Sequence, residues 1–356
     1  MICNLPMTWT SKYFVVVAVF RRMRLIVFCC IAVITVALMS LSKESSSKSQ
    51  SKDLQGLNDS SVHGMWGFGA DTIYFVPYRS KSIRVEIQVS KAVGADVPRK
   101  MLLLLPGWNY ADTQWCTRTS VCSTALSRGF DVMLVEMGKS IYMDSLYPEM
   151  RVDYREHPTR VWLWNEVMKP LQVRGYFTDK GVPEDPVRIS NGKVMYKSLR
   201  LPIPTFVMGL STGARGALLL AIEHPEAFRG CAGLSGDYNP LLMKTDNLMI
   251  NCLGKYEQVP WRWRGSNNIQ LRINELKVPC YLAHGEADKI VPVLQSQQLC
   301  DADEKIRRAA GSSSKRSTMK LVLVKNGSHN YTFWGEQGIL ALDFFEELFK
   351  NAFISK

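Results

Sequence analysis

A serine between two glycines is the residue of this chain whose surroundings most favour covalent chemistry. Ser211 lies in the pentapeptide GLSTG, between an apolar run at 204–210 and a helical stretch of small residues at 212–223. A serine on a sharp strand-to-helix turn presents its hydroxyl for attack on a carbonyl carbon, and the flanking glycines keep the turn free of clashes. The alternative is a serine that only caps the following helix. The strand before it and the helix after it favour a nucleophile.

A serine nucleophile needs a base and an acid that orients the base. Of the five histidines, His329 follows the last predicted strand, in the loop KNGSHNYTFW. Asp288 follows the preceding strand in HGEADKIVP, which gives the chain order serine, acid, histidine. Asp237, in SGDYNP after an earlier strand, is the alternative acid, because an acid at either strand end could reach the imidazole.

The oxyanion formed by attack on a carbonyl requires two hydrogen-bond donors, normally backbone N–H groups. We expect one from Thr212, the residue after the nucleophile, and one from Trp108 in the loop LPGWNY. Ser211, Asp288 and His329 would form a triad that is complete in itself, so no organic cofactor and no metal is implied. The sequence contains no CxxC pair and no cluster with the spacing of zinc ligands.

The elements that must position these residues alternate between strand and helix. An opening antiparallel hairpin is predicted from TIYFVPY and SIRVEIQV, whose apolar residues alternate. Continuous apolar runs, typical of parallel strands buried on both faces, follow at 101–106, 130–136, 204–210, 228–236, 279–285 and 319–324. Helices are predicted at 112–127, 212–223, 292–309 and 334–353. The fold class is therefore α/β, with a doubly wound, mostly parallel sheet.

Two longer intervals interrupt this alternation, at 138–201 and 237–277. Both follow the carboxyl ends of strands, where open α/β sheets bind their ligands. Their large aromatic residues are Tyr142, Trp162, Trp164, Trp261 and Trp263. These insertions either form a cap over the site or carry aromatic side chains that pack on the surface.

The motifs together resemble the α/β-hydrolase superfamily. The stretch GLSTGARGALLLAIEHPEAFRGCAGLSGDYNP and the loop NGSHNYTFW are similar to the esterase D and antigen-85-like branch, which includes carboxylesterases, S-formylglutathione hydrolase and mycolyltransferases. HGEADKIVP resembles dienelactone-hydrolase-like and prolyl-oligopeptidase-like members instead. The resemblance extends over residues 101–353 and implies a serine esterase that forms an acyl-enzyme on Ser211.

That resemblance implies a small-molecule ester, or a polysaccharide or lipid ester, as substrate. An acyltransferase that delivers the acyl group to a sugar or lipid hydroxyl would use the same residues. A serine peptidase and a non-catalytic binding protein with the hydrolase fold are the remaining alternatives. Nucleic acid is not an expected partner, because the basic residues behind the net charge of +12 are scattered and accompany no binding motif.

The N-terminal segment predicts export. Residues 25–41 are an uncharged apolar run that follows arginines, so 1–42 is either a signal peptide or a membrane anchor. A serine-rich linker at 43–65 leads into a catalytic domain at 66–356. We expect a periplasmic, secreted or membrane-anchored enzyme with its catalytic domain outside the cytoplasm. Export would permit disulfides, and Cys116 and Cys122 are the closest pair in this domain.

Overall fold

The computed structural model describes residues 71–91, 99–173, 189–190, 193–194, 203–310 and 318–354. The chain divides into two units, Met1–Gly67 and Phe68–Lys356, and all described residues belong to the second. The predicted signal peptide or anchor at 1–42 and the linker at 43–65 lie outside the described residues.

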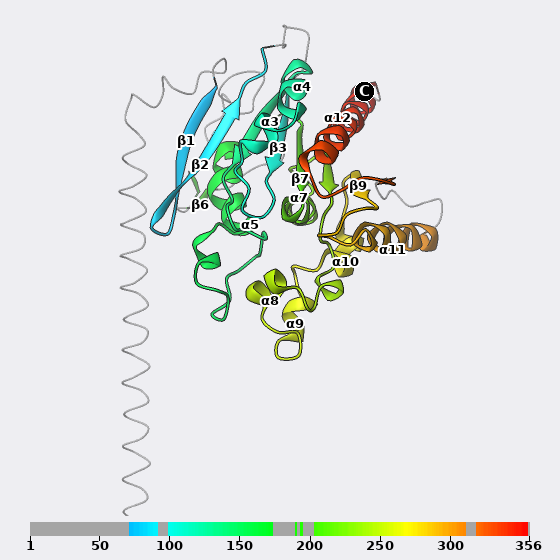
Figure 1. Cartoon of the computed structure of the whole chain (residues 1–356). Helices are drawn as coiled ribbons and strands as arrows, with labels where there is room; N and C mark the ends of the chain where they lie inside the picture. Colours follow the sequence, from blue (N-terminus) through cyan, green and yellow to red (C-terminus); the bar gives the residue numbers. More distant parts are fainter. Residues whose placement is uncertain are drawn as a thin grey trace, which may run out of the picture. The chain divides into compact units, whose positions relative to one another are not determined.

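An eight-stranded sheet in the order β1-β2-β4-β3-β7-β8-β9-β10 forms the centre of the second unit (Figure 1). The strands are β1 (Thr72–Tyr78), β2 (Lys81–Gln88), β3 (Lys100–Leu105), β4 (Phe130–Val135), β7 (Thr205–Leu210), β8 (Gly230–Leu234), β9 (Cys280–Gly285) and β10 (Met319–Val324). The hairpin β1–β2 and the pair β2–β4 are antiparallel, and every other pair is parallel. The predicted doubly wound, mostly parallel α/β-hydrolase sheet is confirmed.

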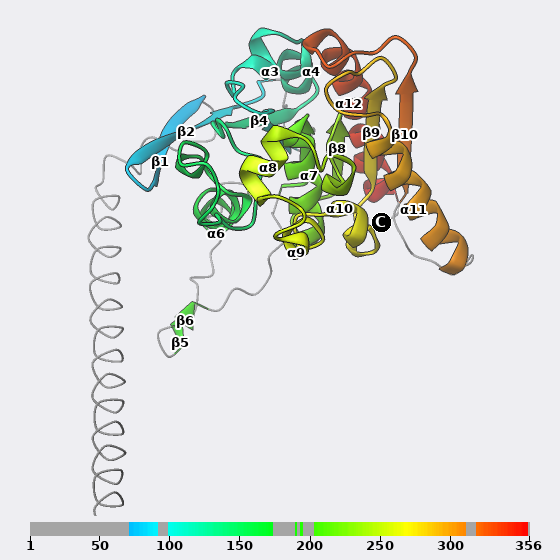
Figure 2. The same cartoon turned by 60° about the horizontal axis from the view of Figure 1, so that its bottom comes forward.

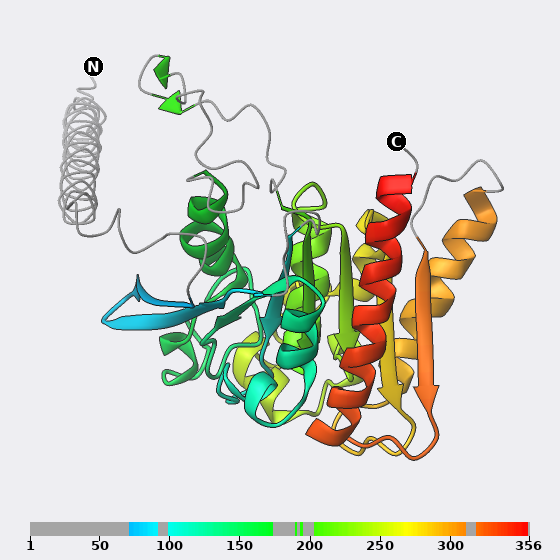
Figure 3. The same cartoon turned by 90° about the horizontal axis from the view of Figure 1, so that it is seen from above.

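Helices cover both faces of this sheet because its central strands are apolar on both sides. On one face, α4 (Val121–Ser127) and α12 (Tyr331–Ile354) pack on Leu102 and Leu104 of β3. On the other, α7 (Thr212–Glu223) and α11 (Leu294–Ala310) enclose a core that includes Leu103 and Leu105. In the view from above, the red α12 lies in front of the strands and the orange α11 behind them (Figure 3).

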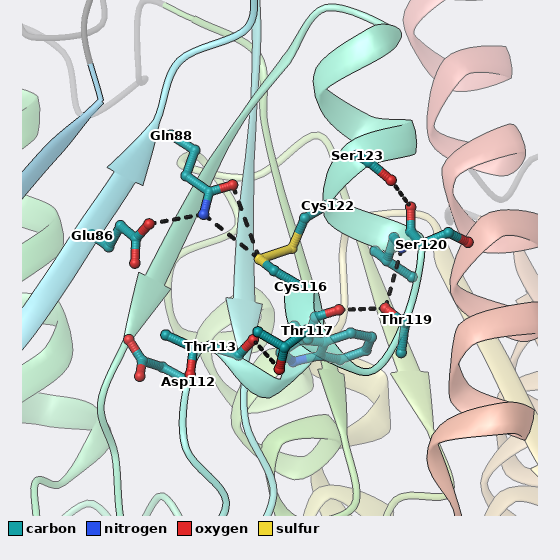
Figure 4. Close-up of a disulfide and its surroundings, with 12 residues drawn as sticks. Glu86, Gln88, Asp112, Thr113, Cys116, Thr117, Thr119, Ser120, Cys122 and Ser123 are labelled. Atoms are coloured by element: carbon teal, nitrogen blue, oxygen red, sulfur yellow. Dashed lines mark hydrogen bonds between the residues drawn. A yellow bond between two sulfur atoms is a disulfide. The ribbon is translucent and has the colours of Figure 1, made fainter.

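The helix predicted at 112–127 is wrong in one respect, since it is divided into α3 (Gln114–Thr117) and α4. The break lies at Thr119, whose hydroxyl donates to the Trp115 carbonyl and accepts from the Val121 N–H. A side chain that bonds the local backbone in this way competes with helical hydrogen bonds. A disulfide joins Cys116 to Cys122 across the break, beside Gln88 of β2 (Figure 4).

The two insertions follow the carboxyl ends of β4 and β8 and supply short helices and a two-stranded sheet. The first contains η2 (Tyr154–Glu156), α5 (Arg160–Trp162), the π-helical η3 (Leu163–Met168), α6 (Lys169–Val173), β5 (Ile189–Ser190) and β6 (Lys193–Val194). The second contains η4 (Pro240–Leu242), α8 (Asn247–Leu253), α9 (Pro260–Trp263), α10 (Ile269–Arg272) and η5 (Ile273–Glu275) (Figure 2). Apolar side chains of both insertions share one cluster, in which Met143 and Met150 meet Met249 and Trp263.

Polar contacts also join the two insertions. Arg160 is 1% exposed and donates to the Tyr142 carbonyl, to Asn267 Oδ1 and, in a two-pronged ion pair, to Glu223 of α7. Four of the five predicted cap aromatics are buried, and Trp261, 63% exposed, is the exception. The insertions are therefore joined to each other and to α7. Of the buried aromatic residues, Tyr142, Trp162 and Trp164 belong to the main core on the α7 face of the sheet, and Trp263 belongs to the cluster that the insertions share.

Candidate active site

Ser211 occupies the sharp turn between β7 and α7. Its backbone has φ 54° and ψ −124°, a conformation that residues with a side chain adopt only where the surrounding structure enforces it. The Ser211 N–H donates to the Leu234 carbonyl at the end of β8 (2.8 Å), which fixes the turn to the neighbouring strand. The side chain thus projects from the carboxyl edge of the sheet, as the nucleophile elbow of this fold requires.

The glycines on either side of Ser211 are required by close backbone packing. A Cβ at Gly209 would lie 2.0 Å from the Gly213 carbonyl oxygen, and a Cβ at Gly213 would lie 2.3 Å from the Leu105 carbonyl oxygen. Both distances are far shorter than a van der Waals contact. The elbow can therefore fold only because the sequence has glycine at these two positions.

His329 lies against the nucleophile, in the loop between β10 and α12. Its Nε2 is 3.0 Å from Ser211 Oγ, within hydrogen-bond distance. Trp334 of α12 contacts the imidazole edge-on, with ring centroids 4.9 Å apart, and donates its indole N–H to Ser235 Oγ. The buried indole therefore restricts the orientation of the imidazole, which leaves Nε2 facing the serine.

Asp288 accepts from the other nitrogen of the same imidazole. His329 Nδ1 lies 2.7 Å from Asp288 Oδ2, and Asp288 Oδ1 accepts the N–H groups of Ile290 (2.8 Å) and Val291 (2.9 Å). Burial raises the pKa of this carboxyl, but the contacts with His284, His329 and the Val291 N–H outweigh burial and hold the pKa well below its usual range. The carboxylate is thus an ionised acceptor in a fixed orientation.

The alternative acid, Asp237, has a different partner. It forms a buried ion pair with Arg215 of α7, with 2.8 Å between Asp237 Oδ2 and the guanidinium, and both side chains are at most 2% exposed. Burial raises the pKa of Asp237, against the opposing charge of Arg215. The structure therefore joins Asp288, and not Asp237, to His329.

The two expected oxyanion donors flank the serine. Thr212 is the first residue of α7, where a backbone N–H has no intrahelical acceptor. Trp108 follows Gly107, and a Cβ at Gly107 would lie 3.1 Å from Ser211 Cβ, so this loop runs directly beside the nucleophile. The Trp108 ring packs edge-on against Tyr154 of the first insertion, with centroids 4.6 Å apart.

Sequence reasoning assigned no specific contact to two groups that shape the site. His284, at the end of β9, is completely buried beside Asp288. Tyr142 of the first insertion donates its hydroxyl to the Pro106 carbonyl (2.8 Å), next to the loop of Trp108. The ring of Tyr142 fits over Gly216 of α7, where a Cβ would approach it to 2.4 Å. The glycine at 216 is the one sequence signal for this close approach.

No helix within the described ranges is long and apolar enough to cross a membrane. The apolar run at 25–41 falls outside those ranges.

Part of this chain is similar to a known protein family. Residues 194–343 match the model of the family described as "Putative esterase". No curated protein matches the chain.

Solved structures of similar fold cover most of this chain, all at low sequence identity. S-formylglutathione hydrolase from Agrobacterium tumefaciens has a TM-score of 0.54 and 14% identity, with 79% of this chain and 96% of that chain covered. The fluorophosphonate-binding serine hydrolase F of Staphylococcus aureus has a TM-score of 0.53 and 14% identity, with 78% and 98% covered. MPT51 of Mycobacterium tuberculosis has a TM-score of 0.52 and 15% identity, with 77% and 97% covered.

Proposed function

We propose that the chain is a serine esterase, similar to the esterase D and antigen-85-like branch of the α/β-hydrolases, which cleaves carboxylic esters through an acyl-enzyme on Ser211. The observation that carries the proposal is the continuous series of contacts from Ser211 Oγ to His329 Nε2 (3.0 Å) and from His329 Nδ1 to Asp288 Oδ2 (2.7 Å). This series supports acyl transfer by a nucleophile, a base and an orienting acid.

In the first half-reaction, Ser211 Oγ attacks the ester carbonyl carbon while His329 Nε2 takes the hydroxyl proton. Asp288 holds the Nδ1–H tautomer and stabilises the imidazolium that results. The bond to the leaving oxygen then breaks, and His329 returns its proton to the departing alcohol. In the second half-reaction, a water molecule loses a proton to His329 and attacks the acyl carbon. The bond from that carbon to Ser211 Oγ then breaks, and His329 returns the proton to Oγ, which releases the carboxylic acid and restores Ser211.

The N–H groups of Thr212 and Trp108 are the proposed donors to the tetrahedral oxyanion. Such donors stabilise charge that exists only in the transition state, and removal of one typically costs about 10²-fold to 10³-fold in kcat. Their contribution comes from the backbone, so it does not depend on the side chain at position 108. The proximity of Gly107 to Ser211 supports this assignment.

The decisive experiment compares the wild type with Ser211→Ala. We expect the wild type to hydrolyse p-nitrophenyl acetate and to react with a fluorophosphonate at Ser211, and the variant to lose about 10⁶-fold in kcat and all labelling. Ser123→Ala, at an exposed serine of α4, is the matched control and should behave as the wild type. Near-wild-type turnover by Ser211→Ala would exclude the proposed mechanism.

The same assay separates hydrolysis from acyl transfer. With a sugar or lipid alcohol present, a hydrolase releases free acid, whereas an acyltransferase gives a new ester in proportion to the alcohol. We propose water as the acceptor, in keeping with the esterase family match.

We further propose that the catalytic domain acts outside the cytoplasm. The apolar run at 25–41 and the disulfide between Cys116 and Cys122 support this location, because disulfides persist in oxidising compartments. Protein isolated with free thiols blocked should gain two further alkyl groups, on these two cysteines, only after reduction. Alkylation of both cysteines without reduction would contradict the proposal.

A further inference from the structure

A second histidine contacts the acid of the proposed triad. His284 is 0% exposed, and its Nε2 lies 3.0 Å from the Val291 carbonyl oxygen and 3.5 Å from Asp288 Oδ2. Its Nδ1 lies 2.7 Å from Ser296 Oγ, on the first turn of α11. Both ring nitrogens therefore have a hydrogen-bond partner, and Nε2 also lies close to the oxygen that accepts from His329.

These neighbours determine which nitrogen of His284 carries the proton. The Val291 carbonyl and the Asp288 carboxylate can only accept, so Nε2 must be the donor. Ser296 can donate through its hydroxyl, so Nδ1 can remain unprotonated as the acceptor. Nε2 of His284 is accordingly the donor, to the Val291 carbonyl at 3.0 Å, with Asp288 Oδ2 beside it at 3.5 Å.

We propose that His284 is a positioning residue for the triad. It orients Asp288 Oδ2 toward His329 and partly offsets the negative charge of the Asp288 carboxylate beside the His329 imidazole. This inference rests on the proposed function. The same ring also secures the acid loop, because Val291 accepts from His284 through its carbonyl and donates to Asp288 Oδ1 through its N–H.

Few other charged groups face this pair. Glu286 and Lys289 belong to the same loop and are exposed to solvent. Among the described residues, the titratable groups that shift the pKa of Asp288 are His284 and His329. On neighbouring elements, Ser296 of α11 and Trp334 of α12 are uncharged. A change in the pH profile after substitution of His284 can therefore be assigned to this small cluster.

The test uses the full chain with three substitutions. His284→Asn retains a polar group near Ser296 but lacks the donor toward Asp288, whereas His284→Gln extends an amide to about the position of Nε2. Ser296→Ala is the matched control, because it removes a hydrogen bond from the same ring at the nitrogen that faces away from the acid. For each protein, kcat and KM for p-nitrophenyl acetate, the pH profile of kcat/KM and the rate of fluorophosphonate labelling are measured.

We expect His284→Asn to lose about 10-fold to 100-fold in kcat with little change in KM, as a misplaced catalytic group does. The acid limb of its kcat/KM profile should move to higher pH, because the Asp288 carboxylate without the His284 N–H beside it stabilises the His329 imidazolium more strongly. His284→Gln and Ser296→Ala should stay within about threefold of the wild type with an unchanged limb. If the acid limb of the His284→Asn profile lies at the same pH as that of Ser296→Ala, His284 contributes only packing and the proposal is wrong.

A measurement on the wild type covers the case in which His284→Asn does not fold. Nitrogen-15 NMR of the imidazoles should show a proton on Nε2 of His284 throughout the pH range of activity. An Nδ1–H tautomer with no proton on Nε2 would overturn the proposal. A wild type that neither hydrolyses esters nor reacts with the fluorophosphonate would overturn the proposed function itself. An active wild type, together with an unaltered pH profile of His284→Asn, would overturn only the role of His284.

Discussion

Two loops at the same edge of the sheet carry an aspartate in equivalent places, and only one of them contacts the histidine. Asp237 is the third residue after β8, and Asp288 is the third residue after β9. Asp237 pairs with Arg215 of α7, while Asp288 pairs with His329. Position relative to the strand is therefore not sufficient to make an acid part of the triad.

The surroundings of the two carboxylates explain the difference. Both oxygens of Asp288 accept hydrogen bonds, and the pKa of its carboxyl is lowered. Asp237 Oδ1, by contrast, is buried with no hydrogen-bond partner among the described residues, and burial raises the pKa of this carboxyl. One loop surrounds its acid with hydrogen-bond donors, and the acid of the other loop neutralises a buried arginine.

The largest expected difference between the loops is in turnover. Asp288→Asn should lower kcat by about 10⁴-fold with the fold intact, because the amide favours the wrong imidazole tautomer. Asp237→Asn, the matched change in the other loop, should lose less than about tenfold, through effects on stability alone. Both variants are measured with the same ester, and circular dichroism confirms that each is folded. A reversed ranking would assign the acid to the loop after β8.

The second difference is in stability. Arg215→Met leaves the Asp237 carboxylate buried without its partner and should lower the free energy of unfolding by about 3–5 kcal/mol in urea titrations. Arg308→Met, at an arginine that is 81% exposed and paired with Glu304, is the matched control and should change it by less than about 1 kcal/mol. Equal losses in the two variants would show that the buried pair has no special structural role.

The smallest difference is in the pH dependence of stability, where the two acids have opposite signs. Asp288 has a folded pKa below its unfolded value of about 3.9, so its contribution is present above that pH and is lost as pH falls through the folded pKa. Asp237 has a raised folded pKa, so its contribution increases as pH falls through that pKa.

Urea unfolding between about pH 3 and 6 tests these signs. The difference in free energy of unfolding between the wild type and Asp288→Asn should shrink as pH falls. Relative to Asp237→Asn, the wild type should become more stable as pH falls. Parallel curves for the two variants would contradict the opposite pKa shifts.

The sequence predicted the elements that local patterns determine. The apolar runs located the strands because those strands are buried on both faces, and GLSTG located the elbow because two backbone clashes require its glycines. The choice between Asp237 and Asp288 depended on Arg215, the one basic residue of α7, and nothing in the sequence around Arg215 indicates its partner. The contacts of His284 were missed for a similar reason, since they come from α11 and from the loop after its own strand.

Arg160 has a consequence for attempts to change substrate preference by mutation. It joins Asn267 of the second insertion, Glu223 of α7 and the Tyr142 carbonyl of the first, and Arg160 and Asn267 are 107 residues apart in sequence. Substitutions that share a buried hydrogen-bond network typically interact by about 0.5–3 kcal/mol. Changes selected separately in the two insertions will therefore not combine additively around this arginine, and libraries that vary both insertions together will sample combinations that stepwise selection misses.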